Sequence, residues 1–360
     1  MAAPTTNSAM YRTMHWQPED LRRLLTTGWD QAVEAASLLI GAQRVVLVGI
    51  GTSYHAALVG SWLLRAAGLD ARAMLSSDVA LYPEAVAFQP GDVVIVMAHT
   101  GVKRFSGEAM ARAHAAGATV LSVGSQTAEH SGSRLVLRTV ERETSAAYTA
   151  SHLAAMTVLA QVAAEIGERG TADDSGATGF RAALARLPDQ VADALGREAE
   201  VVPVARQAAE RRVYVTGAGP NEATALEAVI KVREAAYGQI DALALEQFLH
   251  GPIVAVNAGD LAGVVHVPGA AAERTAEVAA VLEAMGAHLW VVGQPLQAVP
   301  EATTFALAGV ADLPERLSPL LAVVPMQLLA YHMAAHKGIN PDTFRRDDPK
   351  YAAAFGLIKL

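Results

Sequence analysis

The sequence of 360 residues contains no cysteine, which excludes disulfides, thiolate metal sites and a cysteine nucleophile. Aromatic residues make up only 5% of it, and the first residues lack the apolar core of a signal peptide. No apolar run reaches membrane-spanning length without a charge or a helix breaker. We therefore expect a cytoplasmic protein that has no membrane partner.

Positive charge is also scarce, because 28 Lys and Arg stand against 36 Asp and Glu, for a formal net charge of -8. This balance argues against a general nucleic-acid partner. It does not exclude an anionic small-molecule ligand, since backbone N–H groups at a helix start bind phosphate without a basic surface. No cluster of His and acidic residues has metal-ligand spacing, so we expect neither a metal nor a cofactor.

Hydrophobic residues make up 52% of the sequence, and many fall in short runs that occur twice at almost one spacing. The paired runs are Arg44–Ser53 with Arg212–Asn221, Asp92–Gly101 with Asp260–Gly269, and Gly117–Gly124 with Gly286–Gly293. Short β-branched runs closed by glycine are typical of buried parallel strands. Ala-rich helical stretches follow at Tyr54–Ala67 and Glu222–Tyr237. The repeat predicts an α/β protein with two tandem doubly wound parallel sheets, flavodoxin-like, with helices on both faces.

A linker is expected between the two halves, because Glu168–Gly179 is rich in Gly, Ser, Thr and Asp. Helical patterns at Trp29–Ile40 and Phe180–Leu195 open the two halves. The expected organisation is a lead-in at 1–30, a first domain at 31–170, a linker at 171–179, a second domain at 180–340 and a tail at 341–360.

The first candidate site is the strand end Gly49–Ser53, since ligands of doubly wound sheets bind beyond the carboxyl ends of strands. Gly51 allows close backbone approach, Thr52 and Ser53 carry hydroxyl donors, and the following helix start favours an anion. The alternative is a Ser/Thr helix cap without a ligand. A dinucleotide fingerprint is excluded because the third glycine of that motif is missing.

The second candidate site is the strand end that contains His99, Thr100 and Lys103. The Thr100 hydroxyl and the Lys103 ammonium are suited to bind phosphate oxygens, and Arg104 adds positive charge. The alternative is a solvated turn.

Two further clusters lie in the second half. Glu227, Lys231 and Glu234 are spaced by four and three residues, which puts them on one helix face. A surface ion-pair face, contributing roughly 0.2–0.5 kcal/mol per pair, is the alternative to a functional cluster. His250 precedes Gly-Pro and is either a proton-transferring imidazole or a packed loop histidine.

Taken together, these motifs resemble the SIS (sugar isomerase) family. In chain order they are GTS, the strand-end loop, ETSAAYTAS, LEAVIKVREAAY, EQFLHGP and PMQLLAYHMAAHKGINPD. The chain is similar to the isomerase half of glucosamine-6-phosphate synthase and to stand-alone tandem-SIS deaminases, isomerases and fructosamine-phosphate deglycases. The resemblance spans about residues 14–350 and implies two tandem SIS domains.

The resemblance also implies catalytic roles. Glu234 matches the base that moves a proton between C1 and C2, and Lys231 matches a lysine beside the reactive end of the sugar. Glu227 matches a supporting glutamate. His250 matches a ring-opening histidine, often lent by the other subunit of a homodimer with a shared active site. Lys350 matches a C-terminal lysine that closes over the sugar.

The implied phosphate and substrate contacts are Thr52, Ser53 and Thr100, together with Ser145, Ala146 and Tyr148 of the ETSAAYTAS segment. The sequence departs from the family at three of the expected hydroxyl positions, which hold Ala98, Lys103 and Tyr148. These departures leave the sugar, and whether it carries a phosphate, undetermined.

The resemblance implies an aldose–ketose isomerase or an amino-sugar-phosphate deaminase acting on a sugar phosphate like glucosamine 6-phosphate. We expect no glutaminase half, so glutamine cannot be the nitrogen source through this chain alone, and transfer would require free ammonia or a partner. Two alternatives stay open: a fructosamine-phosphate deglycase, and a non-catalytic protein that senses a sugar phosphate and regulates a partner.

Overall fold

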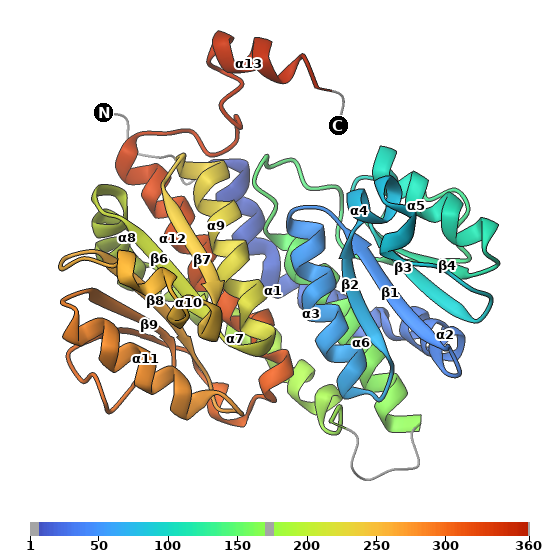
Figure 1. Ribbon diagram of the computed structural model, residues 1–360, viewed down its shortest axis with the longest axis horizontal. Coiled ribbons are helices and arrows are strands. Elements are labelled where there is room, and N and C mark those ends of the chain that lie inside the picture. The colour runs from blue at the N-terminus through green and yellow to red at the C-terminus, as the bar shows by residue number, and fades with distance from the viewer. Residues whose placement is uncertain (1–6, 170–175, 359–360) are drawn as a thin grey trace. The chain divides into compact units, whose positions relative to one another are not determined.

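The computed structural model describes residues 7–169 and 176–358 and contains two five-stranded sheets (Figure 1). The first sheet consists of β1 (Arg44–Gly49), β2 (Ala71–Leu75), β3 (Asp92–Met97), β4 (Thr119–Gly124) and β5 (Leu135–Arg138). The second consists of β6 (Val213–Gly217), β7 (Ile240–Ala244), β8 (Leu261–His266), β9 (His288–Gly293) and β10 (Thr303–Ala306). All strand pairs are parallel.

Both sheets have the same strand order. It is β2-β1-β3-β4-β5 in the first sheet and, read from the other edge, β7-β6-β8-β9-β10 in the second. The three repeated sequence runs form β1 with β6, β3 with β8 and β4 with β9. The expected α/β fold with two parallel sheets flanked by helices is therefore confirmed.

The helices occupy most of the remaining chain. They are α1 (Ala9–Thr27), α2 (Trp29–Leu39), α3 (Thr52–Ala66), α4 (Ser76–Leu81), α5 (Arg104–Ala115), α6 (Ala150–Arg169), α7 (Phe180–Gly196), α8 (Val201–Glu210), α9 (Glu222–Ala236), α10 (Leu245–Leu249), α11 (Ala272–Ala284), α12 (Pro319–Lys337) and α13 (Pro349–Phe355). The four helical stretches expected from the sequence correspond to α2, α3, α7 and α9, within two residues at each end.

Contacts divide the chain into two compact units. The N-terminal unit contains Gln17–Glu143 and Ala150–Pro188 and carries the first sheet. The C-terminal unit contains the described residues up to Trp16, Thr144–Thr149 and those from Asp189 onward, and it carries the second sheet. The start of α1 and the segment Thr144–Thr149 thus belong to the unit that carries the second sheet, and the expected domain ranges stay a prediction. Of the expected linker, residues 171–175 lie outside the described residues.

Each sheet is covered on both faces within its own unit. In the N-terminal unit, α2, α3 and α6 pack against one another. Helices α4 and α5 pack against each other and enclose a separate hydrophobic cluster with β1, β3 and β4. In the C-terminal unit, α10 and α11 cover one face, and α8, α9 and α12 cover the other (Figure 1). Burial on both faces explains why the strands read as continuous apolar runs rather than as alternating ones.

One helical segment, Glu315–Lys337, is long and apolar enough to cross a membrane by length and composition alone. Its most apolar window is 94% buried within the structure. The segment includes α12, which packs against α8 and α9, so its composition is that of a core helix of the C-terminal unit.

Gly60 in α3 tests the close packing of the N-terminal unit. A Cβ at Gly60 would lie 2.5 Å from a methyl carbon of Leu159 and 2.8 Å from one of Leu47, both in the core. We expect Gly60→Ala to lower the free energy of unfolding by about 1–3 kcal/mol, because neighbouring side chains must shift. The matched control is Gly196→Ala in α7, where a Cβ meets nothing within 4 Å. Urea denaturation measures both; equal stability of the two variants would contradict the packing argument.

Candidate functional site

The first strand-end loop forms a sharp turn between β1 and α3. Gly51 has a φ of 59°, and a Cβ at Gly49 would lie 2.6 Å from the backbone of Ser53. Only glycine at position 49 therefore lets the start of α3 approach the strand end this closely. Thr52 and Ser53 are the first two residues of α3, where the helix dipole and backbone N–H groups favour an anion.

The second strand-end loop lies at the same edge of the sheet, because β1 and β3 are hydrogen-bonded neighbours. In this strand order the β1–β3 boundary is the topological switch point, where doubly wound sheets bind ligands. His99 and Thr100 follow β3 directly, and exposed Lys103 precedes α5. The structure thus brings the predicted residues Gly51–Ser53 and His99–Thr100 to one edge.

His99 is held by a neighbour that the sequence analysis did not select. The backbone N–H of Glu143 donates to Nε2 of His99 at 3.1 Å, so the neutral ring carries its proton on Nδ1. Burial lowers the pKa of His99, against the opposing charge of Glu143. The Glu143 carboxylate accepts from the backbone N–H of Ser151 at 3.0 Å and from its hydroxyl at 2.6 Å. Glu143 is the first residue of the ETSAAYTAS segment, and its place in that motif was the feature of the sequence that could have identified it.

Ser145, Ala146 and Tyr148 belong to the C-terminal unit, whereas the other predicted substrate-binding residues belong to the N-terminal unit. Ser145 is buried, and its hydroxyl donates to the carbonyl of Ala147 at 3.0 Å and accepts from that residue's N–H at 3.2 Å. This local turn fixes the shape of the segment.

The predicted cluster on α9 is brought together by the helix. Nζ of Lys231 lies 2.5 Å from Oε2 of Glu234 and 3.6 Å from Oε1 of Glu227. The side chain of Lys231 is 1% exposed, that of Glu227 is 0% exposed, and that of Glu234 is 24% exposed. The surface ion-pair interpretation is therefore wrong for Glu227 and Lys231.

Burial decides what this cluster contributes. A buried ammonium is stable only when carboxylates compensate for the hydration that it loses. Glu227 is fully enclosed and supplies a compensating negative charge, while the side chain of Glu234 stays partly accessible to solvent. The arrangement holds one carboxylate oxygen at a fixed position beside a cation, which suits a group that moves a proton.

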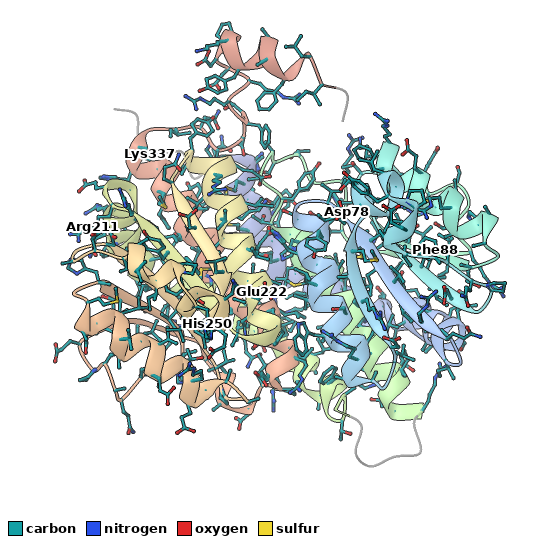
Figure 2. All side chains as sticks on the ribbon, viewed as in Figure 1. Asp78, Phe88, Arg211, Glu222, His250 and Lys337 are labelled. Carbon is teal, nitrogen blue, oxygen red and sulfur yellow. The ribbon has the colours of Figure 1, made fainter. Side chains whose placement is uncertain are left out.

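His250 lies away from this cluster. It follows α10, on the opposite face of the sheet from α9, and its side chain is 77% exposed (Figure 2). Its Nε2 lies 3.6 Å from Oε2 of Glu246 in the same helical turn. The alternative of a packed loop histidine is therefore wrong, and within this chain the structure does not bring His250 to Glu234.

Lys350 lies in the first turn of α13 and is exposed. Its backbone N–H donates to Oδ1 of Asp348 at 3.0 Å, which caps the helix. Among the described residues, no group of three or more His, Asp or Glu is arranged to hold a metal ion.

Comparison with known proteins bears on this geometry. Residues 38–165, which carry the first sheet, match the SIS domain family. The glutamine–fructose-6-phosphate aminotransferase (isomerizing) of Pyrococcus horikoshii is 27% identical over 338 residues, which are 92% of this chain and 56% of the relative. The chain thus spans about half the length of the curated relatives that it matches. Because the family match ends at residue 165, a tandem arrangement of two SIS domains stays a prediction.

Solved structures share the fold over nearly the whole chain. The C-terminal domain of glucosamine-fructose-6-phosphate aminotransferase from Francisella tularensis superposes with a TM-score of 0.82 at 19% identity, covering 92% of this chain and 97% of that one. Tagatose-6-phosphate ketose/aldose isomerase from Escherichia coli superposes with a TM-score of 0.78 at 19% identity, covering 95% of this chain and 96% of that one. Glucosamine-6-phosphate deaminase from Thermotoga maritima superposes with a TM-score of 0.70 at 20% identity, covering 93% of this chain and 97% of that one.

The buried ion cluster of α9 is tested by removing its cation. We expect Lys231→Met to lower the free energy of unfolding by about 3–5 kcal/mol, because Glu227 is left as an uncompensated buried charge. The double variant Glu227→Gln/Lys231→Met removes both charges and is expected to be more stable than Lys231→Met alone. Chemical denaturation measures the free energy of unfolding of the two single variants and the double variant. Strictly additive effects of the two changes would contradict the coupling between Glu227 and Lys231.

Proposed function

We propose that this protein is an enzyme that moves a proton between C1 and C2 of an open-chain sugar phosphate, as an aldose–ketose isomerase or an amino-sugar-phosphate deaminase. The observation that carries the proposal is the α9 cluster, in which partly exposed Glu234 is paired with buried Lys231. The SIS match and the names of the relatives support the sugar-phosphate class.

In the proposed reaction, Glu234 removes the proton from one carbon and returns it to its neighbour. The negative charge that develops on the enediolate oxygen is stabilised by the Lys231 ammonium. Glu227 keeps that ammonium in place, because it balances the charge from the buried side. A second proton moves from the C1 hydroxyl to the C2 oxygen, so the isomerisation consumes and releases nothing else.

Phosphate binding is proposed for the edge formed by Gly51, Thr52, Ser53 and Thr100. Hydroxyl and backbone N–H donors at a helix start suit a phosphate. Lys103 replaces a family hydroxyl with a positive charge that attracts the same group at longer range.

His250 is proposed to open the sugar ring in the site of a second copy of this chain. Its exposure, and its position on the opposite face of the sheet from α9, support a role toward a neighbouring subunit rather than within its own. Lys350, exposed in the first turn of α13, is proposed as a further contact to the sugar.

The role of Glu234 is tested by Glu234→Gln, which keeps the shape and removes the base. We expect kcat on glucosamine 6-phosphate or fructose 6-phosphate to fall by about 10²–10⁴-fold, with sugar-phosphate binding nearly unchanged. Product NMR measures turnover and calorimetry measures binding. The control is Glu273→Gln, the same change at the exposed start of α11.

Normal turnover by Glu234→Gln would refute the catalytic assignment. Ligand binding by the wild type without product from any sugar phosphate in a panel would instead favour the non-catalytic sensor.

The role of His250 across subunits is tested by mixing two inactive variants, Glu234→Gln and His250→Ala. In a two-fold dimer, a mixed pair contains one site with both native residues. Unfolding and refolding the mixture is therefore expected to restore about one quarter of wild-type activity, since half of the dimers are mixed. No recovery on mixing, with each variant alone inactive, would mean that both residues act from one chain.

A further inference from the structure

The second sheet has a switch-point edge of its own. Strands β6 and β8 are hydrogen-bonded neighbours, as β1 and β3 are in the first sheet. Because the strand order is the same in both sheets, the β6–β8 boundary is the place where a doubly wound sheet binds a ligand. Residues 218–221 follow β6 at this edge, and residues 267–271 follow β8. Every phosphate contact proposed above lies in the N-terminal unit, so this second edge has no assigned role.

The glycines of the second edge repeat those of the first. Within the paired sequence runs, Gly219 stands at the position of Gly51, and Gly269 stands at the position of Gly101. The turn after the strand also has the same backbone conformation, since φ is 59° at Gly51 and 55° at Gly219. The second sheet therefore keeps the turn geometry that allows a ligand to approach the backbone closely.

A carboxylate of the chain itself, that of Glu315, lies at this edge. Its Oε2 accepts from the backbone N–H of Ala270 at 3.2 Å. A Cβ at Gly269 would lie 2.5 Å from the same oxygen, and a Cβ at Gly219 would lie 4.0 Å from Oε1. The carboxylate thus contacts the loops after β6 and β8, and it takes space that only a glycine at position 269 leaves open.

The backbone of Glu315 is fixed by the turn after β6. The Ser318 hydroxyl donates to the carbonyl oxygen of Glu315 at 2.6 Å and accepts from Nδ2 of Asn221 at 2.8 Å. Asn221 stands at the position that Ser53 has in the first sheet. The side chain that replaces a candidate phosphate ligand of the first edge therefore holds the internal carboxylate in the second.

The other hydroxyls of the first edge are also replaced in the second. Pro220 stands at the position of Thr52, and Pro268 stands at the position of Thr100. Proline offers neither a hydroxyl nor a backbone N–H donor. The second edge is therefore poorer in donors than the first.

The donors that remain at the second edge suit an anion. Nη1 of Arg316 lies 3.2 Å from Oε2 of Glu315, and the Arg316 side chain is 43% exposed, against 12% for Glu315. Helix α11 begins two residues after Ala270, and its dipole favours negative charge near this end. The carboxylate thus has a backbone N–H, a guanidinium and a helix start around it.

We propose that the carboxyl edge of the second sheet is an anion-binding site that the chain closes with its own Glu315 carboxylate. A phosphate group uses the same donors, namely the N–H of Ala270 and the guanidinium of Arg316. An internal carboxylate competes at a high effective concentration, because it is tethered beside the site. The native chain therefore keeps one open edge for a substrate anion, that of the first sheet. None of these residues belongs to the α9 cluster, so the site does not depend on the proposed reaction.

The experiment removes the internal anion by Glu315→Ala and uses inorganic phosphate as the probe. Thermal unfolding is followed during a phosphate titration at constant ionic strength, since a ligand of the folded state raises Tm. We expect phosphate to raise the Tm of Glu315→Ala more than that of the wild type. The excess should correspond to a gain in phosphate affinity at this edge of about 10- to 100-fold, as one charged hydrogen-bond partner supplies.

Two further variants serve as controls. Glu301→Ala removes the same charge at an exposed position that precedes β10, at the amino end of a strand, and is expected to respond like the wild type. Glu315→Ala/Arg316→Gln empties the site but lacks its cation, so it is expected to lose most of the gain. If Glu315→Ala does not fold, Glu315→Ser takes its place, because its shorter side chain also leaves the N–H of Ala270 open.

A crystal structure of Glu315→Ala with phosphate locates the ion. Phosphate on the N–H of Ala270 and on Arg316 would support the site. Equal responses of Glu315→Ala and Glu301→Ala, or phosphate found only away from Ala270, would overturn it and leave Glu315 as a brace of the loop after β8. Neither outcome changes the test of the proposed function, which is made at Glu234.

Discussion

The arrangement of the C-terminal unit depends on one buried ammonium, that of Lys231. Taking this charge out of water is unfavourable unless carboxylates stand beside it, and α9 supplies them one turn before and one turn after. Glu227 is enclosed and balances the charge of the ammonium. Glu234 is bound to the same ammonium but remains partly accessible, which is the asymmetry that its proposed role as a base requires.

The parallel sheets supply the second constraint. Because neighbouring strands point the same way, their carboxyl ends present loops and helix starts at one edge. In the N-terminal unit this edge holds the turn at Gly51 and the loop at His99, whose ring is set by the N–H of Glu143. The next six residues, Thr144–Thr149, belong to the C-terminal unit, and α6, which follows them, belongs to the N-terminal unit again. A single segment thus contributes to both units.

The family match and the α9 cluster occupy different parts of the chain. The SIS match covers residues 38–165, and the cluster proposed for proton transfer lies outside it on α9. Two cations lie near the candidate site residues: Lys103 follows β3, and Arg345 lines a pocket at the end of α9. One fold carries many functions, because function depends on the residues of the site.

The sequence by itself determined the three repeated pairs of strands, four of the helices and the doubling of the sheet, because apolar runs and glycine turns act over a few neighbouring residues. It also placed Glu227, Lys231 and Glu234 on one helix face. Only the tertiary structure decided that Lys231 is buried, that His250 is exposed, and that Tyr237 and Arg345 meet in one pocket. Those outcomes depend on which distant segments pack together, and local spacing carries no information about a partner a hundred residues away.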